Sequence, residues 1–116
     1  MPLSWDQISE LALTNLSPEE RLSSVVYLEE RVLPKGAVLE VDGEEMRMPW
    51  PAVKVFVDLE PTANWGHDCR YLLINAESGE LRAIDARFPP FVHGTPDRLR
   101  VILKGEAVPG WAVACS

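Results

Sequence analysis

The sequence is poor in cysteine, in histidine and in clustered basic residues. Its 116 residues include two cysteines, Cys69 and Cys115, and two histidines. A single cysteine pair does not decide the redox compartment, because it can be two reduced thiols or one disulfide. Lysine and arginine total 11 against 18 acidic residues, which gives a net charge of −7. Phosphate binding relies on clustered lysine and arginine, so this balance argues against a nucleic-acid partner and is compatible with a basic protein partner.

Targeting and membrane-spanning segments are also missing from the sequence. No stretch approaches the roughly 18 consecutive apolar residues of a transmembrane helix. Residues 1–6 lack the basic region and the following apolar run of a signal peptide. We therefore expect a cytoplasmic protein without a membrane partner.

Familiar catalytic motifs are absent as well. The chain has no phosphate-binding glycine loop, no GxSxG elbow, no HExxH helix and no CxxC pair. These absences favour a non-catalytic protein over an enzyme, and they predict no bound cofactor.

The overall composition is that of one globular domain. Apolar residues make up 47% of the chain and charged residues 25%, which is unlike a disordered segment. A length of 116 residues falls within the usual range of a single domain. We expect residues 1–116 to form one α+β domain.

Two helix starts can be recognised near the N-terminus. Ser4 begins a capping box, and apolar residues then recur at helical spacing. Ser17 begins a second capping box, with Pro18 at the first helical position. Apolar residues within 22–33 then fall on one helical face, and Pro34 ends the pattern. The patterns predict two helices, of which the second is long and packs on a sheet.

An antiparallel sheet is expected after the second helix. The dipeptide Asp42-Gly43 supplies the positive φ angles of a type I′ turn between strands 37–41 and 44–48. Alternating apolar residues predict further strands at 52–60, 69–75, 81–87, 98–104 and 108–115. The expected fold is α+β: two N-terminal helices, the second packed on one face of a curved antiparallel sheet of about five to six strands.

Segment 64–71 carries the most unusual combination of side chains. If it is extended, Trp65, His67 and Cys69 share one face by the two-residue period. One hypothesis is a metal site in which His67 and Cys69 bind an ion and His93, Asp58 or Cys115 supplies the remaining ligands. Another is nucleophilic catalysis, with Cys69 as the thiolate and His67 or His93 as its base. The third is a structural role, which we favour because cysteine and aromatic residues are common in protein cores.

Aromatic residues provide the best candidates for a partner-binding surface. Four tryptophans in 116 residues is a high number. Aromatic side chains are enriched among the residues that contribute most to protein binding. The candidates are Trp50, Trp65, Phe88, Phe91 and Trp111. An exposed sheet edge could also accept a strand from a partner.

Segment 71–81 reads YLLINAESGEL, an apolar strand, a turn that contains Ser-Gly-Glu, and the start of a second strand. It resembles the strand–turn–strand unit of propeptide-type peptidase-regulatory domains. The resemblance implies an inhibitory or regulatory role through protein binding.

These observations together favour a small, acidic, non-catalytic protein-binding module of the inhibitor, immunity or adaptor type. Its expected partner is another protein, and it is expected to be a monomer or a homodimer. The alternative is a metal- or thiol-dependent site built on His67, Cys69 and His93. A ligand pocket under the curved sheet is a further hypothesis, for which the sequence offers no specific residues.

Overall fold

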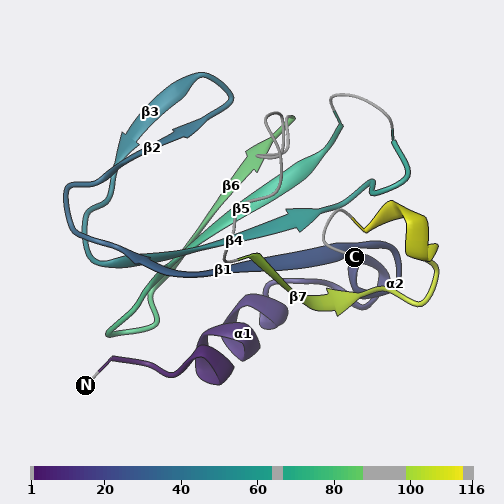
Figure 1. Ribbon diagram of the computed structural model, residues 1–116, viewed down its shortest axis with the longest axis horizontal. Coiled ribbons are helices and arrows are strands. Elements are labelled where there is room, and N and C mark those ends of the chain that lie inside the picture. The colour runs from purple at the N-terminus through teal and green to yellow at the C-terminus, as the bar shows by residue number, and fades with distance from the viewer. Residues whose placement is uncertain (1, 64–66, 88–98, 114–116) are drawn as a thin grey trace.

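The computed structural model describes residues 2–63, 67–87 and 99–113, which form two short α-helices, one of them packed on an antiparallel sheet (Figure 1). In chain order the elements are α1 (Trp5–Thr14), α2 (Pro18–Ser23), β1 (Val25–Leu33), β2 (Val38–Val41), β3 (Glu44–Arg47), β4 (Ala52–Asp58), β5 (Cys69–Asn75), β6 (Leu81–Ala86), β7 (Leu99–Lys104) and the 3-10 helix η1 (Gly110–Ala112).

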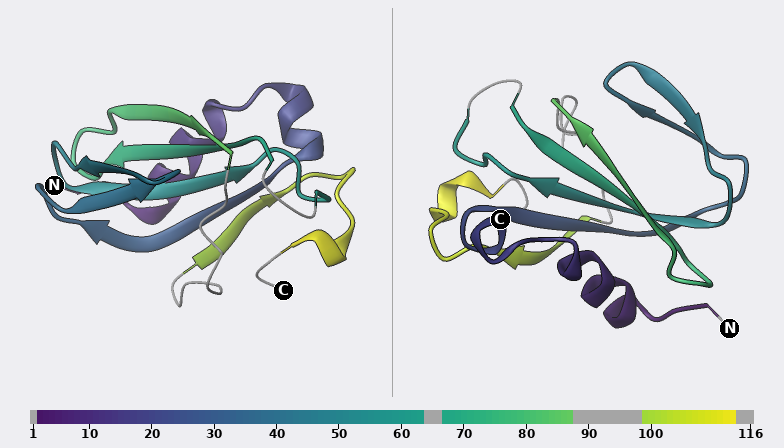
Figure 2. Two further views of the ribbon diagram at one scale, coloured as in Figure 1. Left: turned by 90° about the horizontal axis from the view of Figure 1, so that it is seen from above. Right: turned by 180° about the vertical axis from the view of Figure 1, so that it is seen from behind.

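The main sheet has five strands in the order β6-β5-β4-β1-β7, and each neighbouring pair is antiparallel. Strands β2 and β3 form a separate hairpin. Helix α1 lies on one side of the sheet and the hairpin lies on the other (Figure 2). The α+β class and the antiparallel sheet predicted from the sequence are confirmed. Among the described residues, no helix has the length and apolar character needed to span a bilayer.

Aliphatic packing holds α1 on its face of the sheet. Ile8 and Ala12 of α1 are buried against β1, β4 and β5. Strand β4 contributes Val53, Val55 and Val57 to this layer, as its two-residue alternation predicts.

The opposite face of the sheet is lined by aromatic rings. The ring centroids of Tyr27 and Phe56 are 5.9 Å apart, and those of Phe56 and Tyr71 are 5.4 Å apart. Val41 from the hairpin and Val108 near the C-terminal end pack into the same cluster. Burial of this apolar surface therefore fixes the hairpin over the aromatic face.

The predicted second helix is wrong beyond Ser23. Residues Val25–Leu33 form strand β1 instead, and the backbone is already extended at Ser24, with φ −110° and ψ 161°. The run Val25–Leu28 is buried on both faces of the sheet. By periodicity alone, a short apolar run that is buried on both sides of a sheet cannot be distinguished from the apolar face of a helix. The β-branched and aromatic residues of this run fit the strand that forms.

The packing predicted for the second helix is not confirmed, because α2 buries none of its residues. Helix α1 provides the packed layer instead. Both predicted capping boxes do form: the Ser4 hydroxyl accepts the Gln7 N–H, and the Ser17 hydroxyl accepts the Glu20 N–H, each at 3.1 Å.

The hairpin and strands β4 to β7 lie close to their predicted bounds. In the hairpin, Val38 pairs with Arg47 and Val41 with Glu44, as the Asp-Gly turn predicts. The strand predicted at 108–115 is wrong over Gly110–Ala112, which forms η1. Proline at 109 has no N–H for a ladder, and this favours a turn of 3-10 helix.

Candidate functional site

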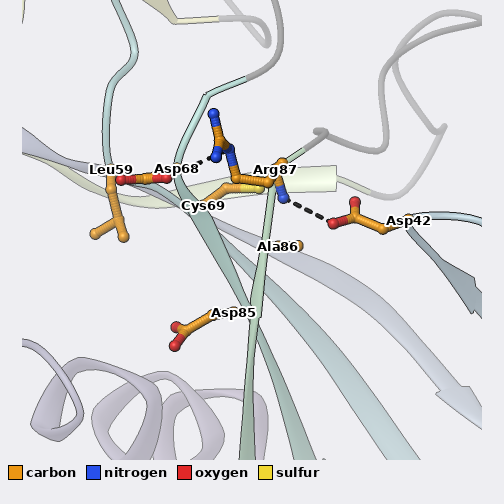
Figure 3. Close-up of a pocket in the computed structure, with 7 residues that line it drawn as sticks. All are labelled: Asp42, Leu59, Asp68, Cys69, Asp85, Ala86 and Arg87. Carbon is orange, nitrogen blue, oxygen red and sulfur yellow. Dashed lines mark hydrogen bonds and ion pairs between the residues drawn. The ribbon is translucent and has the colours of Figure 1, made fainter.

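A pocket of about 440 Å³ opens at the end of the sheet where β5 begins and β6 ends (Figure 3). Ligand pockets in proteins have volumes of roughly 300–1,000 Å³, so this one has room for several side chains of a partner. Its lining residues come from the hairpin turn, the β4–β5 connection, β5 and β6: Asp42, Leu59, Asp68, Cys69, Asp85, Ala86 and Arg87.

Asp42 connects the hairpin to the end of β6. It opens the β2–β3 turn with φ 51°, in the left-handed region, and Gly43 follows with φ 82°. Aspartate and glycine tolerate this region better than other residues do. The Asp42 Oδ2 atom accepts a hydrogen bond of 2.8 Å from the backbone N–H of Arg87. The turn that closes the hairpin thus also holds its tip against β6.

A second hollow of about 230 Å³ lies between the hairpin and β6, and it shares Asp42 and Asp85 with the pocket. One wall is the hairpin and the other is β6. We call the two hollows together the β6 groove. The second hollow is lined by Val41, Asp42, Glu44, Met46, Ile84 and Asp85.

Carboxylates dominate the exposed charges of the β6 groove. Asp42, Glu44 and Asp68 are exposed acidic residues on its walls. Arg87 brings a positive charge, and its Nε lies 3.5 Å from the Asp68 Oδ1. The two side chains are 70% and 64% exposed, and ion pairs of that kind contribute at most about 1 kcal/mol. A cation from a partner can therefore replace Arg87 beside Asp68 at small cost.

Asp85 contributes to the groove in a different way from the other carboxylates. Its carboxylate lies 3.6 Å from the Nε of Arg70, on the face of the sheet that α1 covers. Figure 3 shows this side chain pointing away from the Asp68–Arg87 pair. Residue 85 therefore borders both hollows, and its carboxylate, which is 90% exposed, lies on the α1 side of the sheet.

A buried pair of His67 and Asp58 lies next to Cys69. The His67 Nε2 is 2.8 Å from the Asp58 Oδ1, and both residues are buried. Burial raises the pKa of Asp58, and the charge and hydrogen bond of His67 act in the opposite direction. The His67 backbone N–H donates to the Arg87 carbonyl at 2.7 Å. The pair therefore ties the chain that leads into β5 to both β4 and β6.

The thiol of Cys69 is poorly suited to nucleophilic chemistry. Its residue is 1% exposed. Burial raises the pKa of the thiol to about 12, and the charges of Asp42, Asp58 and Asp68 act in the same direction. The thiolate is the nucleophile and the metal ligand, so a thiol that stays protonated near neutral pH lacks the reactive form. The described surroundings of Cys69 do not favour the thiolate hypothesis.

A metal site is not formed within the described part of the chain. In residues 2–63, 67–87 and 99–113, no three His, Cys, Asp or Glu side chains are placed to hold an ion. The metal hypothesis also involves His93, which lies outside the described residues. The site on His67, Cys69 and His93 stays a prediction.

The two described tryptophan candidates lie near opposite ends of β1. Trp50 precedes β4, whose first residue pairs with Leu33, and its ring centroid is 5.8 Å from the Arg82 guanidinium. Trp111 is 73% exposed and follows β7, whose last residue pairs with Val25. The structure does not bring Trp50 and Trp111 into one surface. The other candidates, Trp65, Phe88 and Phe91, lie outside the described residues.

The β6 groove was not found by sequence reasoning. The sequence assigns Asp42 to a turn, without indicating that its carboxylate reaches a residue 45 positions later. Glu44 and Arg87 belong to no recognisable motif. The Asp-Gly turn is the one signal that marks the tip of the hairpin, and which strand that tip meets depends on tertiary folding.

No family model matches the chain, and no curated protein or solved structure matches it. The resemblance of segment 71–81 to propeptide-type regulatory domains therefore has no support beyond those residues.

Proposed function

We propose that this protein is a small, acidic, non-catalytic protein-binding module of the inhibitor, immunity or adaptor type, and that it binds a basic partner protein at the β6 groove. The observation that carries the proposal is the groove itself, an acidic space beside an edge strand of the sheet. Four carboxylates and one guanidinium, that of Arg87, line the groove, and a hollow in which one sign of charge predominates attracts the opposite sign.

The charge of the whole molecule supports the same partner chemistry. The net charge is −7, so a basic protein is attracted over a distance before contact. Within the groove, Asp42, Glu44 and Asp68 come from the hairpin and from the chain that leads into β5. Carboxylates on two separate segments can contact two or more basic side chains of one partner.

The alternative function, a metal- or thiol-dependent site on His67, Cys69 and His93, has weaker support. Burial and the nearby carboxylates keep the Cys69 thiol protonated, and Asp58 already binds the His67 ring. A reactive cysteine normally lies in an electropositive and partly exposed environment, whereas Cys69 has the opposite surroundings.

The first part of the test is site-specific photocrosslinking in the cells that make the protein. A photoreactive residue is placed at Glu44, which lines the groove, or at the neighbouring Glu45, which points to the other face of the hairpin by strand alternation. A groove partner is expected to crosslink from position 44 and much less from position 45. Equal crosslinking from both positions contradicts a groove partner.

The second part measures binding of the purified crosslinked partner to charge variants. Glu44→Lys and Glu45→Lys change the net charge equally, so Glu45→Lys is the matched control. We expect Glu44→Lys to weaken binding about tenfold or more and Glu45→Lys to weaken it about twofold at most. We also expect the association rate to fall as salt is added, because salt screens exposed charges. Equal effects of the two variants, or no effect of salt, would show that the groove does not select a basic partner.

A further inference from the structure

Strand β6 forms one edge of the five-stranded sheet. It pairs with β5 on one side, from Cys69–Ala86 to Ile74–Leu81, without a register shift. The sheet order places no described strand on its other side. An edge strand presents a row of backbone N–H and C=O groups that another chain can pair with.

The register shows which residues of β6 turn their backbone groups outward. In an antiparallel pair, residues alternate between those that bond to the neighbouring strand and those whose groups point away from it. The Asn75 N–H donates to the Glu80 carbonyl at 2.8 Å, so even-numbered positions from 80 to 86 face β5. The backbone groups of Leu81, Ala83 and Asp85 therefore point away from the sheet.

The contact between Arg87 and Asp42 agrees with this assignment. The Arg87 N–H points outward like the groups of the odd-numbered positions and donates to the Asp42 carboxylate of the hairpin, whereas the Arg87 carbonyl turns inward and accepts the His67 N–H at 2.7 Å. The Asp42 carboxylate at the hairpin tip thus already accepts a hydrogen bond from the outer edge, at the residue that follows β6. Along the rest of this edge, no hydrogen bond between described backbone groups reaches Ala83 or Asp85 from outside the sheet.

The space next to this edge is the β6 groove. Residue 85 borders both hollows, and the hairpin residues Glu44 and Met46 form the facing wall. Six residues of strand span roughly 20 Å, which is enough for an added strand of about five residues. Within the described part of the chain, the groove therefore offers backbone groups that pair with no other strand, together with room beside them.

Charge distinguishes the two edges of the sheet. The opposite edge strand, β7, carries Arg100 and Lys104 and no acidic residue. The outer side of β6 faces Asp42 and Glu44 of the hairpin. Arg82 and Arg87 also lie in or beside β6, and the Arg100 Nε of β7 lies 3.6 Å from the Glu30 carboxylate. The hairpin carboxylates are therefore what attracts a basic segment to the β6 edge.

We infer that a basic, extended segment of the partner protein binds by adding a strand to the outer edge of β6, inside the β6 groove. This inference rests on the proposed function and specifies how the partner is held. The backbone groups of Ala83 and Asp85 pair with the added strand, and the basic side chains of that strand contact Glu44 and Asp68. Main-chain hydrogen bonds supply affinity in this binding mode, and alternate side chains supply specificity.

The test uses a displayed library of random peptides of about ten residues, long enough to form one strand. Peptides are selected on the full chain and counter-selected against Glu44→Lys, so that those retained depend on the groove. We expect the retained peptides to carry lysine or arginine at alternating positions. Failure to obtain any peptide that depends on Glu44 would count against the proposed function and this inference together.

Two changes of the backbone then test strand addition itself. Ala83→Pro removes the outward N–H, and proline is tolerated on an edge strand at such a position. We expect it to weaken peptide binding about tenfold or more while circular dichroism and urea unfolding stay close to wild type. The peptide is also made in two versions, with N-methyl groups on the odd or on the even positions. One version should lose binding and the other should keep it, because only one edge of the added strand faces β6.

The outcomes separate the inference from the proposed function. If binding needs Glu44 but both methylated versions bind equally, the groove recognises basic segments without strand addition, and the inference is wrong. The methylated peptides decide the question even if Ala83→Pro fails to fold. A dimer of the free chain that Ala83→Pro disrupts would show that a second copy occupies the β6 edge, which also overturns the inference.

Discussion

Asp58 is the residue from which we expect the clearest dependence of stability on pH. Burial raises its pKa above the ordinary value of 3.8, despite the opposing effect of His67. The folded state therefore binds the Asp58 proton more tightly than the unfolded chain does. The stability that this group contributes is fully present below pH 3.8 and is lost as the pH rises through the folded-state pKa.

The variant Asp58→Asn has no titratable group at position 58. Comparing its stability with that of the wild-type protein therefore measures the contribution of Asp58. The free energy of unfolding is determined by urea denaturation of both proteins at several values from about pH 4 to about pH 7. We expect the wild-type protein to lose stability relative to Asp58→Asn as the pH rises. A difference that stays constant or changes in the opposite direction would mean that the pKa of Asp58 is not raised in the folded protein.

Cys69 is expected to react slowly with alkylating reagents while the protein is folded. Its pKa is raised from 9.0 to about 12, so the folded protein holds about a thousandfold less thiolate than an ordinary cysteine near neutral pH. The rate is measured in a Cys115→Ser background, so that the reaction reports on Cys69 alone. The same variant unfolded in urea is the control. Alkylation in the folded state as fast as in urea would revive the thiol-dependent alternative.

At the scale of elements, the junction between α2 and β1 is fixed by a close contact with the end of β7. The Gly105 N–H donates to the Ser24 carbonyl at 2.9 Å, and the Ala107 N–H donates to the Leu22 carbonyl at 2.9 Å. These bonds hold the segment after β7 against the residues at which the chain changes from helix to strand. The short α2 therefore depends on a contact with a part of the chain far away in sequence.

Gly105→Ala tests this contact. A Cβ atom at position 105 would lie 2.2 Å from the Leu22 carbonyl oxygen and 2.8 Å from that of Arg21, and these are backbone atoms that cannot rotate away. We expect a loss of about 3 kcal/mol or more in the free energy of unfolding. Gly110→Ala is the control, since a Cβ there meets nothing within 4 Å, and its effect should stay within about 0.5 kcal/mol. Similar stabilities of the two variants would show that the junction is not tightly packed.

At the scale of the whole molecule, the two edges of the sheet differ in the charges that lie beside them. The β6 edge faces acidic residues of the hairpin, and the β7 edge carries Arg100 and Lys104. A basic partner is therefore oriented toward one edge before it makes contact. The exposed ring of Trp111 follows β7 and Trp50 precedes β4, so these two aromatic residues lie near opposite ends of β1.

The sequence by itself determined the features that neighbouring residues decide. Ser4 and Ser17 form the capping boxes that their spacing indicates, and Asp42-Gly43 sets the register of the hairpin. The strand faces of β4 follow from the alternation of valine with other residues. Each of these depends on backbone angles and side-chain spacing over a few positions, which a local pattern records directly.

Tertiary structure alone decided that Val25–Leu33 forms a strand and which residues line the β6 groove. The apolar run of this segment suits a helix or a buried strand, and pairing with β4 and β7 selects the strand. The β6 groove likewise exists because Asp42 of the hairpin reaches Arg87 across 45 positions. The pKa of Asp58 is raised by burial, which arises only once distant segments have packed. These outcomes depend on contacts between segments far apart in the chain, and local sequence patterns carry no information about which segments will meet.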